Sequence, residues 1–161
     1  MNRNVGRASA RTEGDGEVAL LPPRSDGTPL RILVVEDEGF VALDVVAHLA
    51  DCGADARVAP TTRTALGMLA ELQPDLVLLD VRLPDGDGVE LAAAMRALSD
   101  VPIIFVTGIA TPATLRRVHS VGSFPVISKP VNLRELRASI LDVLGRWQRD
   151  RQRDELIARS R

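Results

Sequence analysis

The stretch LVLLDVRLPDGDG, residues 76–88, decides the fold class of this chain of 161 residues. It opens with four consecutive apolar residues and then changes abruptly, at Asp80, to a segment rich in Gly and Asp. A continuous apolar run of this kind is typical of a β-strand that is buried on both faces, as in a parallel sheet covered by helices. The sequence therefore predicts a carboxylate at the carboxyl end of a buried strand.

Four further apolar runs occur along the chain, and a segment with helical spacing of apolar residues follows each of the five. The predicted strands are 31–35, 56–59, 76–79, 103–106 and 126–127, and the predicted helices are 40–52, 62–72, 89–98, 114–119 and 133–144. Strands that alternate with helices indicate an α/β protein with a doubly wound parallel sheet. At this length we expect a flavodoxin-like five-stranded sheet of order 2-1-3-4-5 in three α/β/α layers.

Composition divides the chain into three parts. Residues 1–29 are rich in Gly, Pro, Ser and Arg without periodicity, so we expect a flexible leader. Residues 30–145 form the predicted domain, with 10 basic and 15 acidic side chains, and residues 146–161 form a charged helical extension with six Arg and three acids. An acidic domain argues against nucleic acid as a partner.

Other features of the composition limit the class of protein. Aromatic residues are 2% of the chain, so the core must consist of aliphatic side chains. The single cysteine, Cys52, cannot form an internal disulfide, and no apolar run approaches the roughly 18 residues needed to span a bilayer. We therefore expect a cytoplasmic protein without a membrane partner.

Polar residues stand at the ends of four predicted strands. They are Glu36, Asp37 and Glu38, then Asp80, then Thr107 and Gly108, and finally Lys129, which is the only lysine among 20 basic residues. In the expected strand order these groups converge on one edge of the sheet. Carboxylates that lie so close together repel unless a cation intervenes, and oxygen ligands suit Mg²⁺.

These residues resemble the receiver domain of bacterial two-component response regulators over residues 30–145. The resemblance rests on the acidic pair at 36–37, Asp80 with the segment LPDGDG at 83–88, the Thr-Gly pair at 107–108 and the Lys-Pro pair at 129–130. It implies that Asp80 is the phospho-acceptor and that Mg²⁺ is bound directly by Asp37, through water by Glu36, and by the main-chain carbonyl of Arg82. It also implies that Thr107 and Lys129 contact the phosphoryl group.

The chain departs from the general family pattern in its fifth strand. The position that usually carries a switching Tyr or Phe is Val126, and the nearest ring is Phe124, so we assign the switch region to Thr107, Gly108, Phe124 and Val126. Residues 101–109, VPIIFVTGI, are similar to a subfamily named for a Pro-Phe-x-Phe-Ala-Thr-Gly-Tyr stretch. That resemblance implies a histidine kinase of HWE type as the partner.

Three functions remain open on the sequence. The first is a stand-alone receiver, which is a switch whose output is binding of a protein target or a second copy. The second is a Mg²⁺-dependent phosphatase with Asp80 as nucleophile, although Arg82 occupies the place where such enzymes carry a general acid. The third is a scaffold receiver that no longer accepts phosphate, against which the intact acids, threonine and lysine argue.

Two surfaces are predicted to bind partners. In the first helix, Val41, Val45, Leu49 and Cys52 form the stripe that faces the sheet, so the apolar residues on the opposite side form a possible kinase-docking patch: Phe40, Leu43 and Ala47. The last helix is expected to continue past Gly145 through Trp147 into the polar extension. We expect this extension to contribute to self-association or target binding and not to phosphoryl chemistry.

Overall fold

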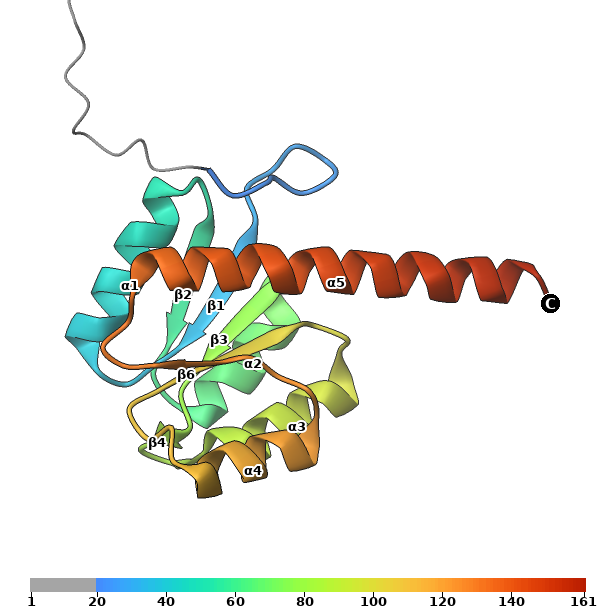
Figure 1. Cartoon of the computed structure of the whole chain (residues 1–161). Helices are drawn as coiled ribbons and strands as arrows, with labels where there is room; N and C mark the ends of the chain where they lie inside the picture. The colour runs from blue at the N-terminus through green and yellow to red at the C-terminus, as the bar shows by residue number, and fades with distance from the viewer. Residues whose placement is uncertain (1–19) are drawn as a thin grey trace, which may run out of the picture.

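The structure, a computed structural model, describes residues 20–161. In this part of the chain one parallel sheet contains five strands in the order β2-β1-β3-β6-β7 (Figure 1). Counted along the chain without the short hairpin, this is the predicted order 2-1-3-4-5. The strands are β1 (Arg31–Val35), β2 (Asp55–Ala59), β3 (Leu76–Leu79), β6 (Ile103–Thr107) and β7 (Val126–Ser128).

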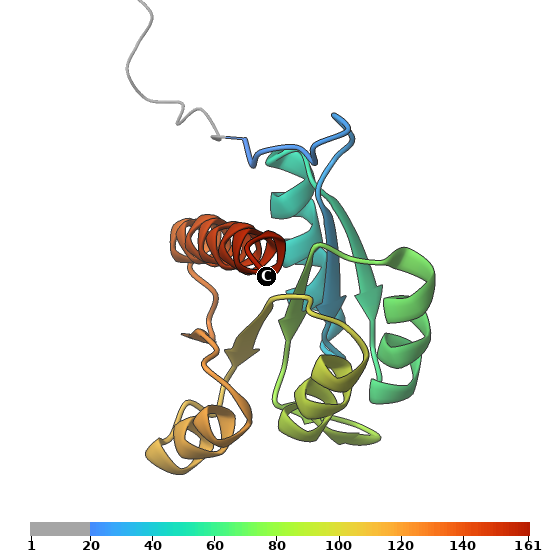
Figure 2. The ribbon, with the colours of Figure 1, turned by 90° about the vertical axis from the view of Figure 1, so that its right-hand side faces the viewer.

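Five helices cover the two faces of the sheet. α1 and α5 lie on one face, and α2, α3 and α4 lie on the other, which gives the predicted three-layer α/β/α arrangement (Figure 2). The bounds are α1 (Gly39–Asp51), α2 (Thr62–Leu72), α3 (Gly88–Leu98), α4 (Pro112–Val121) and α5 (Leu133–Arg159). None of these helices, in residues 20–161, is both long enough and apolar enough to cross a bilayer.

The strands are apolar throughout because both faces of the sheet are covered. In β1, Ile32 and Val34 pack with α1 and α5, whereas Leu33 and Val35 pack with α2 and α3. All four side chains are buried. This is the physical reason that the predicted strands read as continuous apolar runs and not as alternating ones.

Helix α5 is longer than the domain. Its first half is anchored to the sheet by four buried side chains, Leu136, Ile140, Val143 and Leu144. Its second half, from residue 148 onward, is exposed on all sides and projects beyond the body of the molecule (Figure 1). The prediction that this helix continues past Gly145 is confirmed.

Part of the predicted leader packs against the domain. Residues 1–19 lie outside the described residues, but Leu21 is buried and its main-chain N–H donates to the carbonyl oxygen of Cys52 at 2.9 Å. Arg24 forms an ion pair with Asp75 at 3.3 Å. The ordered chain therefore begins before Leu30, where the apolar pattern of the strands starts.

Candidate functional site

The polar residues that follow the strands meet at the carboxyl edge of the sheet. The main-chain N–H of Asp80 donates to the carbonyl of Val35, and that of Lys129 donates to the carbonyl of Thr107, at 3.0 and 2.9 Å. The sheet ladder thus continues one residue beyond β3 and β7, where it fixes the backbone from which Asp80 and Lys129 project. Glu36 follows the neighbouring strand β1 in the same way.

Lys129 is the centre of this cluster. Its Nζ lies 2.6 Å from Oε2 of Glu36, 2.8 Å from Oδ2 of Asp80 and 3.2 Å from Oε1 of Glu38. Only 12% of the lysine side chain is exposed, and Glu36 and Asp80 are both buried. One ammonium group therefore contacts three carboxylates at the rim of the sheet, and its charge offsets only one of theirs.

The environment shifts the protonation of two members of the cluster. Burial raises the pKa of Glu36, and the neighbouring charge of Asp80 acts in the same direction, against the hydrogen bond from Lys129. Burial alone would lower the pKa of Lys129, but its hydrogen bonds to Asp80 and Glu36 outweigh that effect and raise it. The lysine is therefore cationic throughout the physiological pH range.

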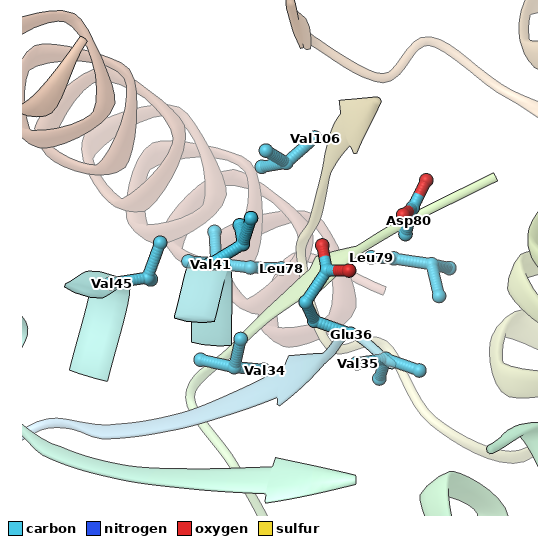
Figure 3. Close-up of a pocket in the computed structure, with 9 residues that line it drawn as sticks. All are labelled: Val34, Val35, Glu36, Val41, Val45, Leu78, Leu79, Asp80 and Val106. Atoms are coloured by element: carbon cyan, nitrogen blue, oxygen red, sulfur yellow. The ribbon is translucent and has the colours of Figure 1, made fainter. Parts of the chain in front are cut away.

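An apolar recess lies behind the carboxylates. Glu36 and Asp80 project from the ends of neighbouring strands, and the other side chains that line the recess are valine and leucine from the sheet and α1 (Figure 3). Burial in these surroundings favours the uncharged form of a carboxyl group unless a cation is close. The site is thus built to hold positive charge beside Asp80.

The carboxylates offer a set of hard oxygen donors. Among the described residues, Glu36, Glu38 and Asp80 have oxygen atoms within 4.8 Å of one another. Asp37, which the resemblance assigns as the direct Mg²⁺ ligand, does not belong to this group and is exposed. The sequence analysis placed Glu38 at this edge within the Glu-Asp-Glu run but assigned no role to it.

The other predicted site residues lie around this cluster. Arg82 is exposed, and its main-chain N–H donates to Oδ1 of Asp80 at 3.3 Å. Thr107 is fully buried, and its hydroxyl accepts from the N–H of Ile109 at 3.2 Å. Gly108 beside it is exposed. The Lys129–Pro130 peptide bond, which follows β7, is cis.

The segment after Asp80 forms a small hairpin, with strands β4 (Arg82–Leu83) and β5 (Gly86–Asp87), that the sequence analysis did not predict. Gly88 closes it: its N–H donates to the carbonyl of Val81 at 2.7 Å, and a Cβ at this position would overlap the carbonyl of Asp80. The residue at this position must therefore be glycine for the backbone to pass so close to Asp80.

Two acids of this hairpin connect it to neighbouring helices. Asp85 accepts from the N–H groups of Thr62 and Arg63 at the start of α2, at 2.7 and 3.1 Å. Asp87 caps α3 and pairs with Arg117 of α4 at 2.7 Å. The run Asp-Gly-Val-Glu at 87–90, with an acid before the helix and another in its first turn, was a readable cap signal.

The predicted switch residue Phe124 is part of the core. Its ring packs edge-on against Phe105 at a centroid distance of 5.6 Å, and the guanidinium of Arg96 lies 5.4 Å from its centre. Val126 is half-buried and pairs with Phe105 in the sheet register. Phe124 is thus held inside the fold rather than placed on the surface.

The predicted docking patch on α1 is exposed. Phe40 is 92% exposed, Leu43 is 68% exposed, and Ala47 is exposed on the same face. The residues of the opposite stripe, Val45 and Leu49, are buried against the sheet. The helix therefore has two apolar faces, of which only one is covered.

Sequence comparison supports the resemblance to a receiver domain. Residues 32–141 match the family model described as the response regulator receiver domain. The chain belongs to the receiver-domain family. Among curated proteins, this receiver is similar to the uncharacterized transcriptional regulatory protein YvcP of Bacillus subtilis, with 36% identity over 72% of this chain and 49% of that protein. It is also similar to BaeR of Escherichia coli, with 32% identity over 86% of this chain and 57% of that protein.

Solved structures agree with the fold. The CheY-like receiver domain protein of Methanospirillum hungatei has a TM-score of 0.73 and 28% identity over 76% of this chain and 99% of that one. The BeF3-activated receiver domain of Klebsiella pneumoniae RstA has a TM-score of 0.68 and 30% identity over 71% of this chain and 97% of that one. The chain spans about half or less of the first curated relatives, and nearly all of these isolated receivers.

Proposed function

We propose that this receiver is a phosphorylation-controlled switch, in which Asp80 accepts a phosphoryl group from a histidine kinase or a phosphotransfer protein. The observation that carries the proposal is the contact of Lys129 with Asp80 and Glu36, at 2.8 and 2.6 Å, on the carboxyl edge of the sheet. A carboxylate can attack phosphorus only if its own charge and that of the incoming group are offset. The site supplies a buried ammonium at that place.

Each residue of the site then has a distinct task. Oδ of Asp80 forms the new bond to phosphorus while the bond from phosphorus to the donor breaks, and the donor leaves with that electron pair. Nζ of Lys129 exchanges its carboxylate contact for the phosphoryl oxygens, which it follows as a point charge. The hydroxyl of Thr107 donates a hydrogen bond to the same group.

The donor set fits a divalent cation, since it consists of carboxylate oxygens at an edge that is open on the side of Asp37. Glu36, Asp37, Asp80 and the main-chain carbonyl of Arg82 would hold Mg²⁺, and the ion would supply a second positive charge to the phosphoryl oxygens. Glu38 lies in the same cluster and contacts Lys129, so it would compete with the phosphoryl oxygens for the lysine ammonium group.

The exposed patch of Phe40, Leu43 and Ala47 is the proposed docking surface for the phosphodonor, because it lies on the helix that begins directly after the acidic residues. The donor is proposed to be a kinase of HWE type, on the resemblance of residues 101–109. The output is proposed to be binding of a protein target or a second copy. Without an aromatic residue at Val126, switching would depend on Thr107, Gly108 and the packing around Phe124.

Incubation with acetyl phosphate and Mg²⁺, followed by intact-mass spectrometry, tests the proposal. A switch gains the mass of one phosphoryl group and holds it, whereas a phosphatase releases phosphate continuously and a scaffold gains nothing. Replacement of Phe40 and Leu43 by alanine would be tested with the cognate kinase. Unchanged transfer to the folded variant would overturn the assignment of the docking surface, while leaving that of Asp80 intact.

A further inference from the structure

The uncovered face of α1 is both apolar and acidic. Phe40 and Leu43 belong to the most exposed large apolar side chains in residues 20–161. Asp44 and Asp51 border them on the same side of the helix and are exposed as well. No lysine or arginine occurs between Arg31 and Arg57. We call the exposed residues of this helix, together with Asp37 and Glu38 directly before it, the acidic face.

The projecting part of α5 has the complementary character. Residues 146–161, here called the basic arm, contain six Arg and three acids. At about 100° per residue, one sector of the arm contains only arginine, serine and two exposed apolar residues. Its large side chains are Arg146, Arg149, Arg153, Leu156 and Ile157. Leu156 is 67% and Ile157 47% exposed.

The ion pairs already present on the arm are weak. Arg146 contacts Asp142 at 2.9 Å, and Arg153 contacts Asp150 at 3.6 Å. All four side chains are more than half exposed, so these contacts contribute little and can be exchanged for others. Arg146 and Arg153 can therefore exchange these contacts for an acidic partner surface.

The arm does not reach the acidic face of its own molecule. Helix α5 is continuous from Leu133 to Arg159, and the arm projects away from α1 on the far side of the body (Figure 1). The helical part of the arm is about 21 Å long and α1 is about 20 Å long, at 1.5 Å per residue. An arm from another molecule could thus contact the acidic face along its whole length.

We propose that the basic arm of one copy packs across the acidic face of α1 in a second copy. Leu156 and Ile157 would cover Phe40 and Leu43, so the arm and the phosphodonor would compete for this patch. Arginines of the arm would face Asp44 and Asp51. Two arms packed against each other would instead bring their arginine sectors together, which electrostatic repulsion disfavours. Because the two contacting surfaces differ, each copy offers one arm and one acidic face, and two copies can exchange arms.

Sedimentation analysis of the full chain without phosphodonor tests this contact. Two double variants test the two surfaces: Phe40→Ser with Leu43→Ser on the face, and Leu156→Ser with Ile157→Ser on the arm. The control is Leu98→Ser, which changes an apolar side chain that lies outside both surfaces and is 72% exposed. All these side chains point to solvent, so the variants should fold, which circular dichroism checks. The wild type and the Leu98 variant should self-associate equally.

The face variant and the arm variant should each associate at least about tenfold more weakly than the wild type. Their equimolar mixture should associate again, since one variant supplies an intact arm and the other an intact face. A monomeric wild type, or a mixture that stays monomeric, would overturn the proposal. Self-association of the face variant together with loss in the arm variant would show that arms pair with arms, which also overturns it.

Exchange of charges tests the electrostatic part of the contact. Arg149→Glu with Arg153→Glu should abolish association, and mixing this variant with Asp44→Arg and Asp51→Arg should restore it. Failure of restoration with both proteins folded would contradict the charge pairing. The contact is proposed for the protein without phosphodonor, so Asp80→Asn should self-associate like the wild type. A failure of this contact is thus distinguishable from a failure of the proposed role of Asp80.

Discussion

Nζ of Lys129 lies 2.8 Å from Oδ2 of Asp80, and the same atom holds Glu36 at 2.6 Å. The only lysine of the chain thus joins the ends of strands β1, β3 and β7 through one buried ammonium group. Arginine could not take its place, because a planar guanidinium does not fit among three carboxylates as a compact point charge does. This contact has consequences for both stability and chemistry.

Removal of that charge should destabilise the fold. In Lys129→Met, Glu36 and Asp80 remain buried without their cation, so we expect the free energy of unfolding to fall by about 2–3 kcal/mol near pH 7. The deficit should shrink as the pH falls, since Glu36, whose pKa burial already raises, then becomes protonated. Urea unfolding of the wild type and of Lys129→Met at about pH 7 and about pH 5 measures this difference in the free energy of unfolding. An equal difference at both pH values would contradict the assignment of Lys129 as the cation that stabilises charged Glu36.

Asp87 is predicted to make stability depend on pH in the acid range. Burial alone would raise its pKa, but the hydrogen bonds from Arg117 and from the start of α3 outweigh it and lower the pKa from 3.8. A lowered pKa means that the stabilisation is complete above 3.8 and is lost as the pH falls through the folded-state value. Asp87→Asn keeps a helix cap but loses the ion pair. Its free energy of unfolding should therefore be lower than that of the wild type near neutral pH, and this difference should disappear at acid pH.

Matched variants separate the two roles of Asp87. Asp87→Ala loses cap and ion pair, and should cost about 1–2 kcal/mol near neutral pH. Arg117→Gln loses only the half-exposed ion pair and should cost less than about 1 kcal/mol. Equal losses for Asp87→Ala and Asp87→Asn would show that the cap contributes nothing.

Two glycines should respond in opposite ways to alanine. A Cβ at Gly88 would overlap the backbone of Asp80, so Gly88→Ala must displace Asp80 and should cost about 1–3 kcal/mol. If Asp80 accepts the phosphoryl group as proposed, the variant should also be phosphorylated more slowly. Gly67, inside α2, has open space around it, and Gly67→Ala should stabilise the protein by about 0.5–1 kcal/mol. Thermal unfolding of the two variants provides the comparison, and a neutral Gly88→Ala would contradict the close approach.

Trp147 fixes the base of the arm. Its indole N–H donates to the carbonyl of Asp100 at 2.8 Å, and the guanidinium of Arg151 lies 4.8 Å from the centre of its ring. Trp147→Phe loses the hydrogen bond but keeps a ring, and should lower the free energy of unfolding by about 1 kcal/mol, with a larger loss for Trp147→Ala. Circular dichroism during urea unfolding reports both, and an unchanged midpoint for Trp147→Ala would exclude this anchoring role.

The strands and the edge residues could be predicted because their signals are local. The apolar run 76–79 and the acid that ends it reflect burial on both faces of a sheet, and the strand order then brings Asp80 and Lys129 to one edge. The same reasoning predicted the uncovered face of α1, since only one of its two apolar faces can pack on the sheet.

Contacts between segments far apart in the sequence could not be predicted in this way. That Glu38 rather than Asp37 turns toward Lys129 depends on how the chain enters α1, which composition does not determine. The burial of Leu21 depends on its hydrogen bond to Cys52, 31 positions later. Phe124 has its place in the core because Phe105 and Arg96 enclose it, a packing relationship that no spacing in the sequence predicts.

The most direct test of the central claim is the intact mass of the wild type and of Asp80→Asn after incubation with acetyl phosphate and Mg²⁺. The account predicts that the wild type gains one phosphoryl group and that Asp80→Asn, which should remain folded, gains none. Lys129→Arg should gain little or none, since the guanidinium does not restore the point charge. Stoichiometric labelling of Asp80→Asn, or a wild type that stays unlabelled with both acetyl phosphate and its kinase, would contradict the account.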